Sequence, residues 1–191
     1  MAMSAPNPVG PAVFVGDAVR VVRHSETVGS GPSPPRRTEI QAPAAAADAS
    51  LQVPGCQLVR LPTFRDPRGQ ITVAELDDAL PFAIHRIFFV YAVPGEHVVR
   101  GDHAHRSCTQ LLLPFCGAVS VVIDDGIVRE EIRLNDPGIG LLIPPGIWSM
   151  QHRVAPGTVL AVFCSERYDP REYIRDYHEF LETVSRSRRE R

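Results

Sequence analysis

Residues 100–117 read RGDHAHRSCTQLLLPFCG, and this stretch says more about the fold and the chemistry than any other part of the chain. Because side chains alternate between the two faces of a β-strand, His103 and His105 are expected to share one face. Gln110 follows after four residues and Gly117 after six more, a pattern that chance produces far less often than a lone histidine. Two imidazoles on one wall of a sheet can bind a metal ion or act as acid and base. The pair therefore predicts a functional site.

Short apolar runs separated by Gly, Pro and Asp extend on both sides of this stretch. They recur about every ten residues, which is typical of an all-β sandwich or barrel. The runs are CQLVRL (56–61), GQITVAEL (69–76), HRIFFVYAV (85–93), CTQLLLPF (108–115), GAVSVVID (117–124), IVREEIRL (127–134), GIGLLIP (138–144) and TVLAVFCS (158–165). The sequence therefore predicts an all-β fold.

Three of these runs carry finer predictions. The dipeptide Asp125-Gly126 predicts a hairpin in which both residues supply the positive φ angles of a tight turn. Residues 128–134 alternate approximately between apolar and charged side chains, so this strand is expected to turn one face to water. Apart from His85, Arg86 and Gln110, residues 85–93 and 110–115 are apolar, which predicts strands that are covered on both faces.

Residues 1–50 differ from the rest of the chain and are expected to form a partly flexible N-terminal extension. Pro, Ala, Gly and Ser dominate, and QAPAAAADAS (41–50) is typical of a linker. Within the extension, VFVGDAVRVVRH (13–24) predicts a strand pair around a Gly-Asp turn. This segment is either a single hairpin or arm that packs on a partner chain, or the remnant of a left-handed β-helix. We favour the hairpin or arm, because one solenoid turn cannot bury its own core.

Residues 51–185 are expected to form the barrel together with a C-terminal α-helix. Asp169 is suited to cap this helix, with Pro170 at its first position. Apolar side chains then recur at helical spacing, at Tyr173, Ile174, Tyr177, Phe180 and Leu181. Residues 186–191 are expected to be a solvated tail.

The composition excludes several classes of function. All 20 basic residues are arginine, and without lysine neither Schiff-base chemistry nor a Walker-type phosphate loop is possible. A net charge of -2 argues against nucleic-acid and membrane-surface partners. No apolar stretch reaches the roughly 18 residues of a membrane span, and the N-terminus lacks the features of a signal peptide. We therefore expect a cytoplasmic location and reduced cysteines at positions 56, 108, 116 and 164.

Residues 100–117 resemble the first motif of the cupin proteins, in which a histidine pair is followed by a glutamate and a glycine. Here Gln110 takes the glutamate position and Gly117 the glycine position. GIGLLIPPGIWSMQH (138–152) resembles the second motif, but Ser149 stands where a histidine ligand is expected. Neutral Gln and Ser are poor ligands for a divalent cation, so we predict a jelly-roll barrel of the cupin type without a metal or other cofactor. His152 is the remaining nearby histidine.

The stretch from about residue 56 to 183 is similar to the cupins that act as dTDP-4-keto-6-deoxyglucose 3,4-ketoisomerases. The matching segments are FRDPRG (64–69), PFAIHRIFFVY (81–91), RGDHAHR (100–106), IDDG (123–126), GLLIPPGIWSMQH (140–152) and SERYDPREYIRDY (165–177). The resemblance implies a deoxysugar-pathway isomerase that moves a ketone from C4 to C3 of a nucleotide sugar through an enediol. It also implies a homodimer, because relatives pair through exchanged N-terminal strands.

By this resemblance, His103 carries a proton between C3 and C4, and His105 assists or orients it. Arginine forks suit a diphosphate, and by the resemblance Arg68 and Arg86 lie near the nucleotide. Arg100 lies just before the pair and is expected either to neutralise developing charge or to bind phosphate. The further substrate-binding candidates are Gln110, Phe88, Trp148, Ser149 and His152. Phe88 and Phe89 stand where the family has two tyrosines, and phenylalanine has no hydroxyl to offer.

Three other hypotheses remain open from the sequence. The missing tyrosine and histidine are compatible with a repurposed metal-free isomerase or cyclase that acts on a natural-product intermediate. A non-catalytic cupin that binds a sugar nucleotide is the second alternative. The third is a metal-dependent oxygenase, against which Gln110 and Ser149 argue.

Overall fold

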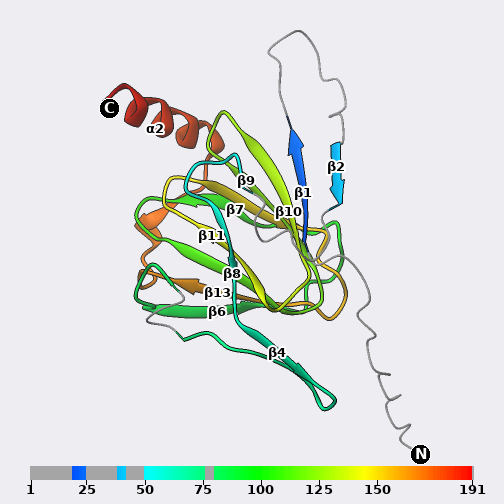
Figure 1. Ribbon diagram of the computed structural model, residues 1–191. Coiled ribbons are helices and arrows are strands. Elements are labelled where there is room, and N and C mark those ends of the chain that lie inside the picture. The colour runs from blue at the N-terminus through cyan, green and yellow to red at the C-terminus, as the bar shows by residue number, and fades with distance from the viewer. Residues whose placement is uncertain (1–18, 25–37, 42–49, 76–79, 191) are drawn as a thin grey trace, which may run out of the picture.

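The computed structural model describes residues 19–24, 38–41, 50–75 and 80–190. Its main body consists of two antiparallel sheets packed face to face as a cupin-like sandwich, which confirms the predicted all-β fold (Figure 1). The larger sheet has the order β14-β7-β12-β9-β10-β1-β2 and the smaller β3-β11-β8-β13-β6. The elements are β1 Val19–His24, β2 Thr38–Gln41, β3 Gln57–Arg60, β4 Thr63–Asp66, β5 Gly69–Thr72, β6 Arg86–Val90, β7 Arg100–His105, β8 Gln110–Cys116, β9 Val119–Asp124, β10 Arg129–Leu134, β11 Ile139–Ile143, β12 Trp148–His152, β13 Val159–Cys164, η2 Pro170–Glu172, β14 Tyr173–Ile174 and α2 Tyr177–Arg189.

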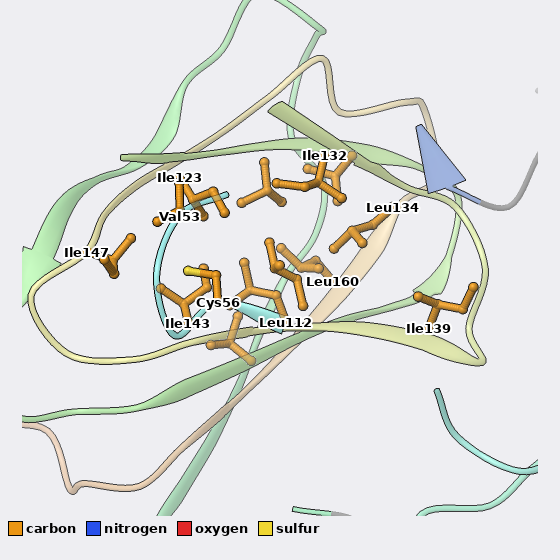
Figure 2. Close-up of a cluster of buried hydrophobic side chains, with 14 of the residues drawn as sticks. Val53, Cys56, Leu112, Ile123, Ile132, Leu134, Ile139, Ile143, Ile147 and Leu160 are labelled. Carbon is orange, nitrogen blue, oxygen red and sulfur yellow. The ribbon is translucent and has the colours of Figure 1, made fainter. Parts of the chain in front are cut away.

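The core lies between the two sheets and consists of aliphatic side chains from both (Figure 2). Strand β10 shows how the sequence produces it: Ile132 and Leu134 point inward, while the charged residues between them are half-buried on the outer face. This confirms the predicted alternation. Glu130 also points inward and is fully buried, where its Oε2 atom accepts hydrogen bonds from the backbone N–H groups of Gln52 (2.6 Å) and Val53 (3.0 Å). The carboxylate therefore ties residues 52–53 to the barrel.

The prediction that both apolar runs are covered on both faces holds only for residues 110–114 of the second run, since Phe115 is 47% exposed. In β8 the residues from Gln110 to Pro114 are buried. In β6, by contrast, the side chains of Ile87 and Phe89 are 48% and 50% exposed. Strand β6 is the edge strand of the smaller sheet, and within the described residues no second layer covers its outward side chains.

The predicted hairpin at residues 125–126 is present between β9 and β10, but its turn differs in detail. Asp124 pairs with Arg129, so four residues lie in the connection. Gly126 has the expected positive φ of 84°, whereas Asp125 is not among the residues with positive φ. The Asp125 carboxylate instead accepts hydrogen bonds from the backbone N–H groups of Ile127 and Val128 at 2.9 and 2.8 Å. The longer loop is therefore held by a side chain rather than by two left-handed residues.

The C-terminal helix begins later than predicted. Asp169 and Pro170 start only the single turn η2, and the next two residues form β14, which pairs with β7. Asp176 then caps α2, which continues to Arg189, so most of the predicted tail is helical. The apolar face of α2 packs on the outer side of the larger sheet through Phe180. No helix in the described ranges is long and apolar enough to cross a membrane.

The N-terminal segment is described only in part. Strand β1 pairs with β10 on one side and with β2 on the other. The predicted turn at residues 16–17 and most of the linker at 41–50 lie outside the described residues. Strands β4 and β5 form a separate hairpin that projects from the body of the sandwich (Figure 1).

Candidate active site

The histidine pair lies on the inner face of β7, as its spacing predicts. The Nε2 atoms of His103 and His105 are 3.2 Å apart, and Ser149 of β12 is the cross-strand neighbour of His103. A bulge precedes the pair, because Gly101 and Asp102 both have positive φ (74° and 58°) and the register with β12 shifts at this point. The positive φ favours glycine at position 101, where a Cβ atom would also lie 3.1 Å from the backbone oxygen of Ser149.

Burial sets the electrostatics of the pair. Loss of hydration lowers the pKa of His105 to about 4, and the neighbouring His103 and Arg86 contribute in the same direction. The pKa of His103 is also lowered, again mainly by burial. Both imidazoles are therefore neutral at neutral pH, so each has one nitrogen lone pair that can accept a proton.

The buried His105 predicts a loss of stability in acid. Because its pKa is lower in the folded protein than in the unfolded chain, the unfolded chain binds the extra proton as the pH falls below about 6.5. We expect His105 to account for roughly 2–3 kcal/mol of lost unfolding free energy between about pH 7 and pH 4.5. The unfolding free energy, measured by denaturant titration at several pH values in this range, should change less with pH for His105→Gln than for the wild type. The exposed-site variant His178→Gln should follow the wild type; equal slopes for all three proteins would contradict the prediction.

The floor of the site is a row of three residues across the smaller sheet. Strand β13 lies between β6 and β8, and the register places Cys164 opposite both Arg86 and Gln110. The Arg86 Nη2 and Gln110 Nε2 atoms are 3.4 and 3.6 Å from the Cys164 Sγ atom. Gln110 Nε2 is also 3.1 Å from His105 Nε2. The structure thus brings the predicted residues Arg86 and Gln110 together with the histidine pair and adds Cys164, which the sequence did not indicate as a site residue.

Tyr173 is a second site residue that the sequence reasoning missed. Its ring centroid is 4.9 Å from that of His103 and 4.5 Å from that of His105. Strand β14 places it there, because Tyr173 pairs directly with His105. The guanidinium of Arg175 lies over the Tyr173 ring, 4.4 Å from its centroid. The phenol therefore closes one side of the histidine pair.

Phe88 lies beside the row of residues on the smaller sheet. The Arg86 guanidinium carbon is 5.5 Å from the centre of the Phe88 ring and 5.6 Å from that of Tyr168. The two rings hold the cation by its attraction to their π faces. Phe88 is therefore next to the site, where it offers an apolar surface and no proton.

The structure does not bring the other predicted residues to the histidine pair. Trp148 and His152 point to the outer face of the larger sheet. There Trp148 packs against α2 and donates a hydrogen bond to Asp102 Oδ1 (3.2 Å), while His152 lies 3.6 Å from Glu131. The strand period of two sends Ser149, and not Trp148 or His152, toward the histidine pair.

The two remaining arginines lie at the surface. Arg100 is exposed at the start of β7. Arg68 is in the turn of the projecting hairpin and forms an ion pair with Asp66 of the same turn, at 2.6 Å. Of the three predicted arginines, only Arg86 lies near the histidine pair within the described part of a single chain.

The described residues contain no group of three or more His, Cys, Asp or Glu side chains arranged to hold a metal ion. Gln110 and Ser149 occupy the two positions at which the cupin motifs carry the other ligands. The absence of a metal cofactor stays a prediction.

The fold and the site together define a class: a cupin-like sandwich whose inner face carries an uncharged histidine pair suited to proton transfer. Residues 54–185 match the protein family described as "FdtA: WxcM-like, C-terminal". The chain belongs to this FdtA/WxcM-like family of dTDP-sugar 3,4-ketoisomerases.

Relatives of known activity support this assignment. A TDP-4-oxo-6-deoxy-alpha-D-glucose-3,4-oxoisomerase from Aneurinibacillus thermoaerophilus is 34% identical over 121 residues, which cover 63% of this chain and 86% of the relative. The sugar 3,4-ketoisomerase QdtA from Thermoanaerobacterium thermosaccharolyticum, solved with TDP, is 30% identical with a TM-score of 0.68, covering 71% and 98% of the two chains. The TDP-quinovose 3,4-ketoisomerase WlaRB from Campylobacter jejuni is 34% identical with a TM-score of 0.64, covering 68% and 99%.

Proposed function

We propose that this protein converts a dTDP-4-keto-6-deoxyhexose into the 3-keto isomer by histidine acid–base catalysis. The observation that carries the proposal is the pair of the half-buried His103 and the buried His105, both uncharged and in contact through their Nε2 atoms. The reaction needs a base whose free form is present at neutral pH, and these imidazoles provide it. The family membership and the relatives supply the reaction type.

The steps balance without an added oxidant or reductant. An imidazole nitrogen of His103 takes the proton from C3, and the electrons of that C–H bond form the double bond of an enediol whose C4 oxygen gains a proton. The same histidine then returns a proton to C4, and the C3 hydroxyl loses its proton as the ketone forms at C3. The oxygen that becomes negative needs hydrogen-bond donors, and Arg86, Gln110 and the phenol of Tyr173 lie beside the pair.

The nucleotide part of the substrate is proposed from the relatives. QdtA was solved with TDP, and a mutant form of QdtA was solved with TDP-4-keto-6-deoxyglucose. Arg86 is suited to an anionic group because its guanidinium is fixed between two rings. The cytoplasmic location and the lack of a metal stay predictions.

Two assays test the proposed function. NMR spectra of the protein with dTDP-4-keto-6-deoxyglucose should show the 3-keto sugar, and TDP at millimolar concentration or below should raise the melting temperature. Binding of TDP without any isomerisation would favour the non-catalytic alternative. The absence of both TDP binding and turnover would favour a repurposed cupin with another substrate.

We also propose that the protein works as a homodimer. Ile87 and Phe89 point outward from the edge strand β6, and Phe115 packs beside Phe89 with ring centroids 5.8 Å apart. Exposed apolar patches of this kind usually mark interfaces. The projecting β4–β5 hairpin carries Arg68 and two further exposed apolar side chains, Phe64 and Ile71. In a dimer, the hairpin could pack these side chains against the second copy.

The variant Phe89→Ser tests the dimer. We expect it to raise the dissociation constant of the dimer by roughly tenfold or more, because the aromatic contact of Phe89 with the partner would be lost. Light scattering during size-exclusion chromatography measures the mass in solution. Ile127→Ser removes an equally apolar side chain from the exposed β9–β10 loop and should leave the mass unchanged. A monomeric wild type would refute the proposal.

A further inference from the structure

Strand β7 contains a bulge directly before the histidine pair. The register places His103 opposite Ser149 and Gly101 opposite the next residue of β12, so Asp102 is the extra residue of the bulge. A bulge of this kind changes which face the neighbouring side chains occupy. The direction of His103 therefore depends on the bulge, because a slip of the strand by one residue would send its imidazole to the opposite face.

The backbone of the bulge has a conformation that most residues avoid. Gly101 and Asp102 have φ angles of 74° and 58°, both in the left-handed region. Glycine adopts this region freely, and aspartate adopts it more readily than most other residues but less readily than glycine. A contact of the Asp102 side chain with its surroundings can therefore stabilise the bulge.

That contact is made by Trp148 of β12. Its Nε1 atom donates a hydrogen bond to the Oδ1 atom of Asp102 at 3.2 Å. The tryptophan is only 3% exposed, and a buried indole N–H needs an acceptor. The hydrogen bond therefore satisfies the indole and at the same time connects the bulge to the neighbouring strand.

Trp148 is a fixed point because it is packed on both sides. Its ring centroid lies 5.2 Å from that of Tyr177 and 5.5 Å from that of Phe180, both on α2. On the other side Trp148 pairs with Ala104, the fully buried residue between the two histidines. This packing leaves the indole little freedom to move. The indole and the bulge thus form one unit on the outer face of the sheet, behind the histidine pair.

We infer that Trp148 and Asp102 are positioning residues, whose hydrogen bond holds the bulge of β7 in the register that directs His103 into the site. For activity, this inference rests on the proposed function, because the position of His103 affects turnover only if this histidine moves the proton. Both residues act through the backbone of β7 and from the outer face of the sheet. The C-terminal helix, which covers Trp148, thereby supports the active site.

The experiment compares three single variants and one double variant. Trp148→Phe keeps an aromatic ring under α2 but removes the N–H donor. Asp102→Gly and Asp102→Asn both remove the charge and both tolerate a positive φ, but only Asp102→Asn keeps an oxygen that can accept the hydrogen bond. The double variant Asp102→Gly/Trp148→Phe shows whether the two side chains act through one interaction.

The kinetic result should follow the hydrogen bond. We expect kcat of Trp148→Phe and of Asp102→Gly to fall about 10- to 100-fold each, because a displacement of about 1 Å at a reacting group costs up to about 100-fold. Asp102→Asn should keep nearly the activity of the wild type. The double variant should lose no more than the larger single loss, because one hydrogen bond can be removed only once. The affinity for TDP should stay unchanged in all four variants.

A measurement without substrate reports the position of His103 itself. Burial lowers the pKa of this histidine, whereas the charge of Asp102 raises it. An imidazole that leaves its buried place regains hydration, and its pKa rises toward about 6.5. NMR titration should therefore give a higher pKa of His103 in Trp148→Phe than in the wild type, and in Asp102→Gly than in Asp102→Asn. Within each of these two comparisons the charge at position 102 is the same. The other groups that face His103 are unchanged in all variants: His105, Tyr173 and Arg175.

Tyr177→Phe is the control for a general loss of stability. It removes the hydrogen bond from the Tyr177 hydroxyl to Asp124 Oδ2 (2.8 Å) but keeps an aromatic ring against Trp148. Its melting temperature should fall, while kcat and the pKa of His103 should stay at their wild-type values.

The inference is overturned if folded Trp148→Phe keeps the wild-type kcat or the wild-type pKa of His103, or if the two single losses add in the double variant. Should Trp148→Phe not fold, the comparison of Asp102→Gly with Asp102→Asn decides, and equal values for these two variants refute the inference. A wild type that does not isomerise the substrate would refute the proposed function. The pKa of His103 in the variants would still test whether the hydrogen bond holds this histidine in place.

Discussion

Replacement of His103 by asparagine is expected to lower kcat of the isomerisation by roughly 10²- to 10⁴-fold, the range that a positioned acid–base group contributes. Asparagine keeps a polar side chain of similar reach but cannot carry a proton between two carbons. His103 lies on the inner face of β7 next to His105, which is the only other proton-carrying imidazole on that strand. Turnover of dTDP-4-keto-6-deoxyglucose followed by NMR measures the loss.

Two controls separate chemistry from folding and binding. The affinity of His103→Asn for TDP should stay close to that of the wild type, because the variant removes a proton carrier rather than a nucleotide contact. His178→Asn, in which the replaced side chain is 82% exposed on α2, should be as active as the wild type. A loss below about tenfold in His103→Asn would mean that another group moves the proton.

The largest stability effect is expected for Glu130→Ala. Its buried carboxylate accepts the N–H groups of Gln52 and Val53, and alanine removes this acceptor from the buried Val53 donor and the part-buried Gln52 donor and leaves a cavity. We expect the free energy of unfolding to fall by roughly 3–5 kcal/mol, since each buried unpaired donor costs about 1–3 kcal/mol. Denaturant titration at neutral pH measures the change.

Neighbouring substitutions test the cause of that loss. Glu130→Gln keeps an oxygen acceptor at the same place and should lose clearly less stability than Glu130→Ala. Glu131→Ala removes the next carboxylate, which points to the outer face and pairs with Arg153, and should change stability by no more than about 1 kcal/mol. Equal losses for all three variants would show that the buried hydrogen bonds are not the cause.

Much of the fold could be predicted because strands obey a short-range rule. The period of two places His103 and His105 on one face and puts Glu130, Ile132 and Leu134 inside the barrel. The same rule, applied to β12, would have separated the inward Ser149 from the outward Trp148 and His152. Those two residues were selected by their closeness to a motif, and closeness along a strand does not mean a shared face.

Other features depend on contacts that no local pattern contains. Tyr173 and Ile174 fit helical spacing, yet pairing with β7 makes them a strand and Asp176 starts the helix. Cys164 faces Gln110, which is far away in the sequence, only because β13 and β8 have one particular register. Strand β6 was expected to be covered on both faces, but in the described part of a single chain its outward side chains Ile87 and Phe89 are exposed.

The proton transfer is tested most directly by incubating the protein with dTDP-4-keto-6-deoxyglucose in deuterated water. Our account predicts that the 3-keto product forms, with deuterium at C4 of the product and at C3 of the recovered substrate. Both labels would arise because the histidine that takes the C3 proton exchanges it with solvent. The absence of both the 3-keto product and exchange at C3 would contradict the account.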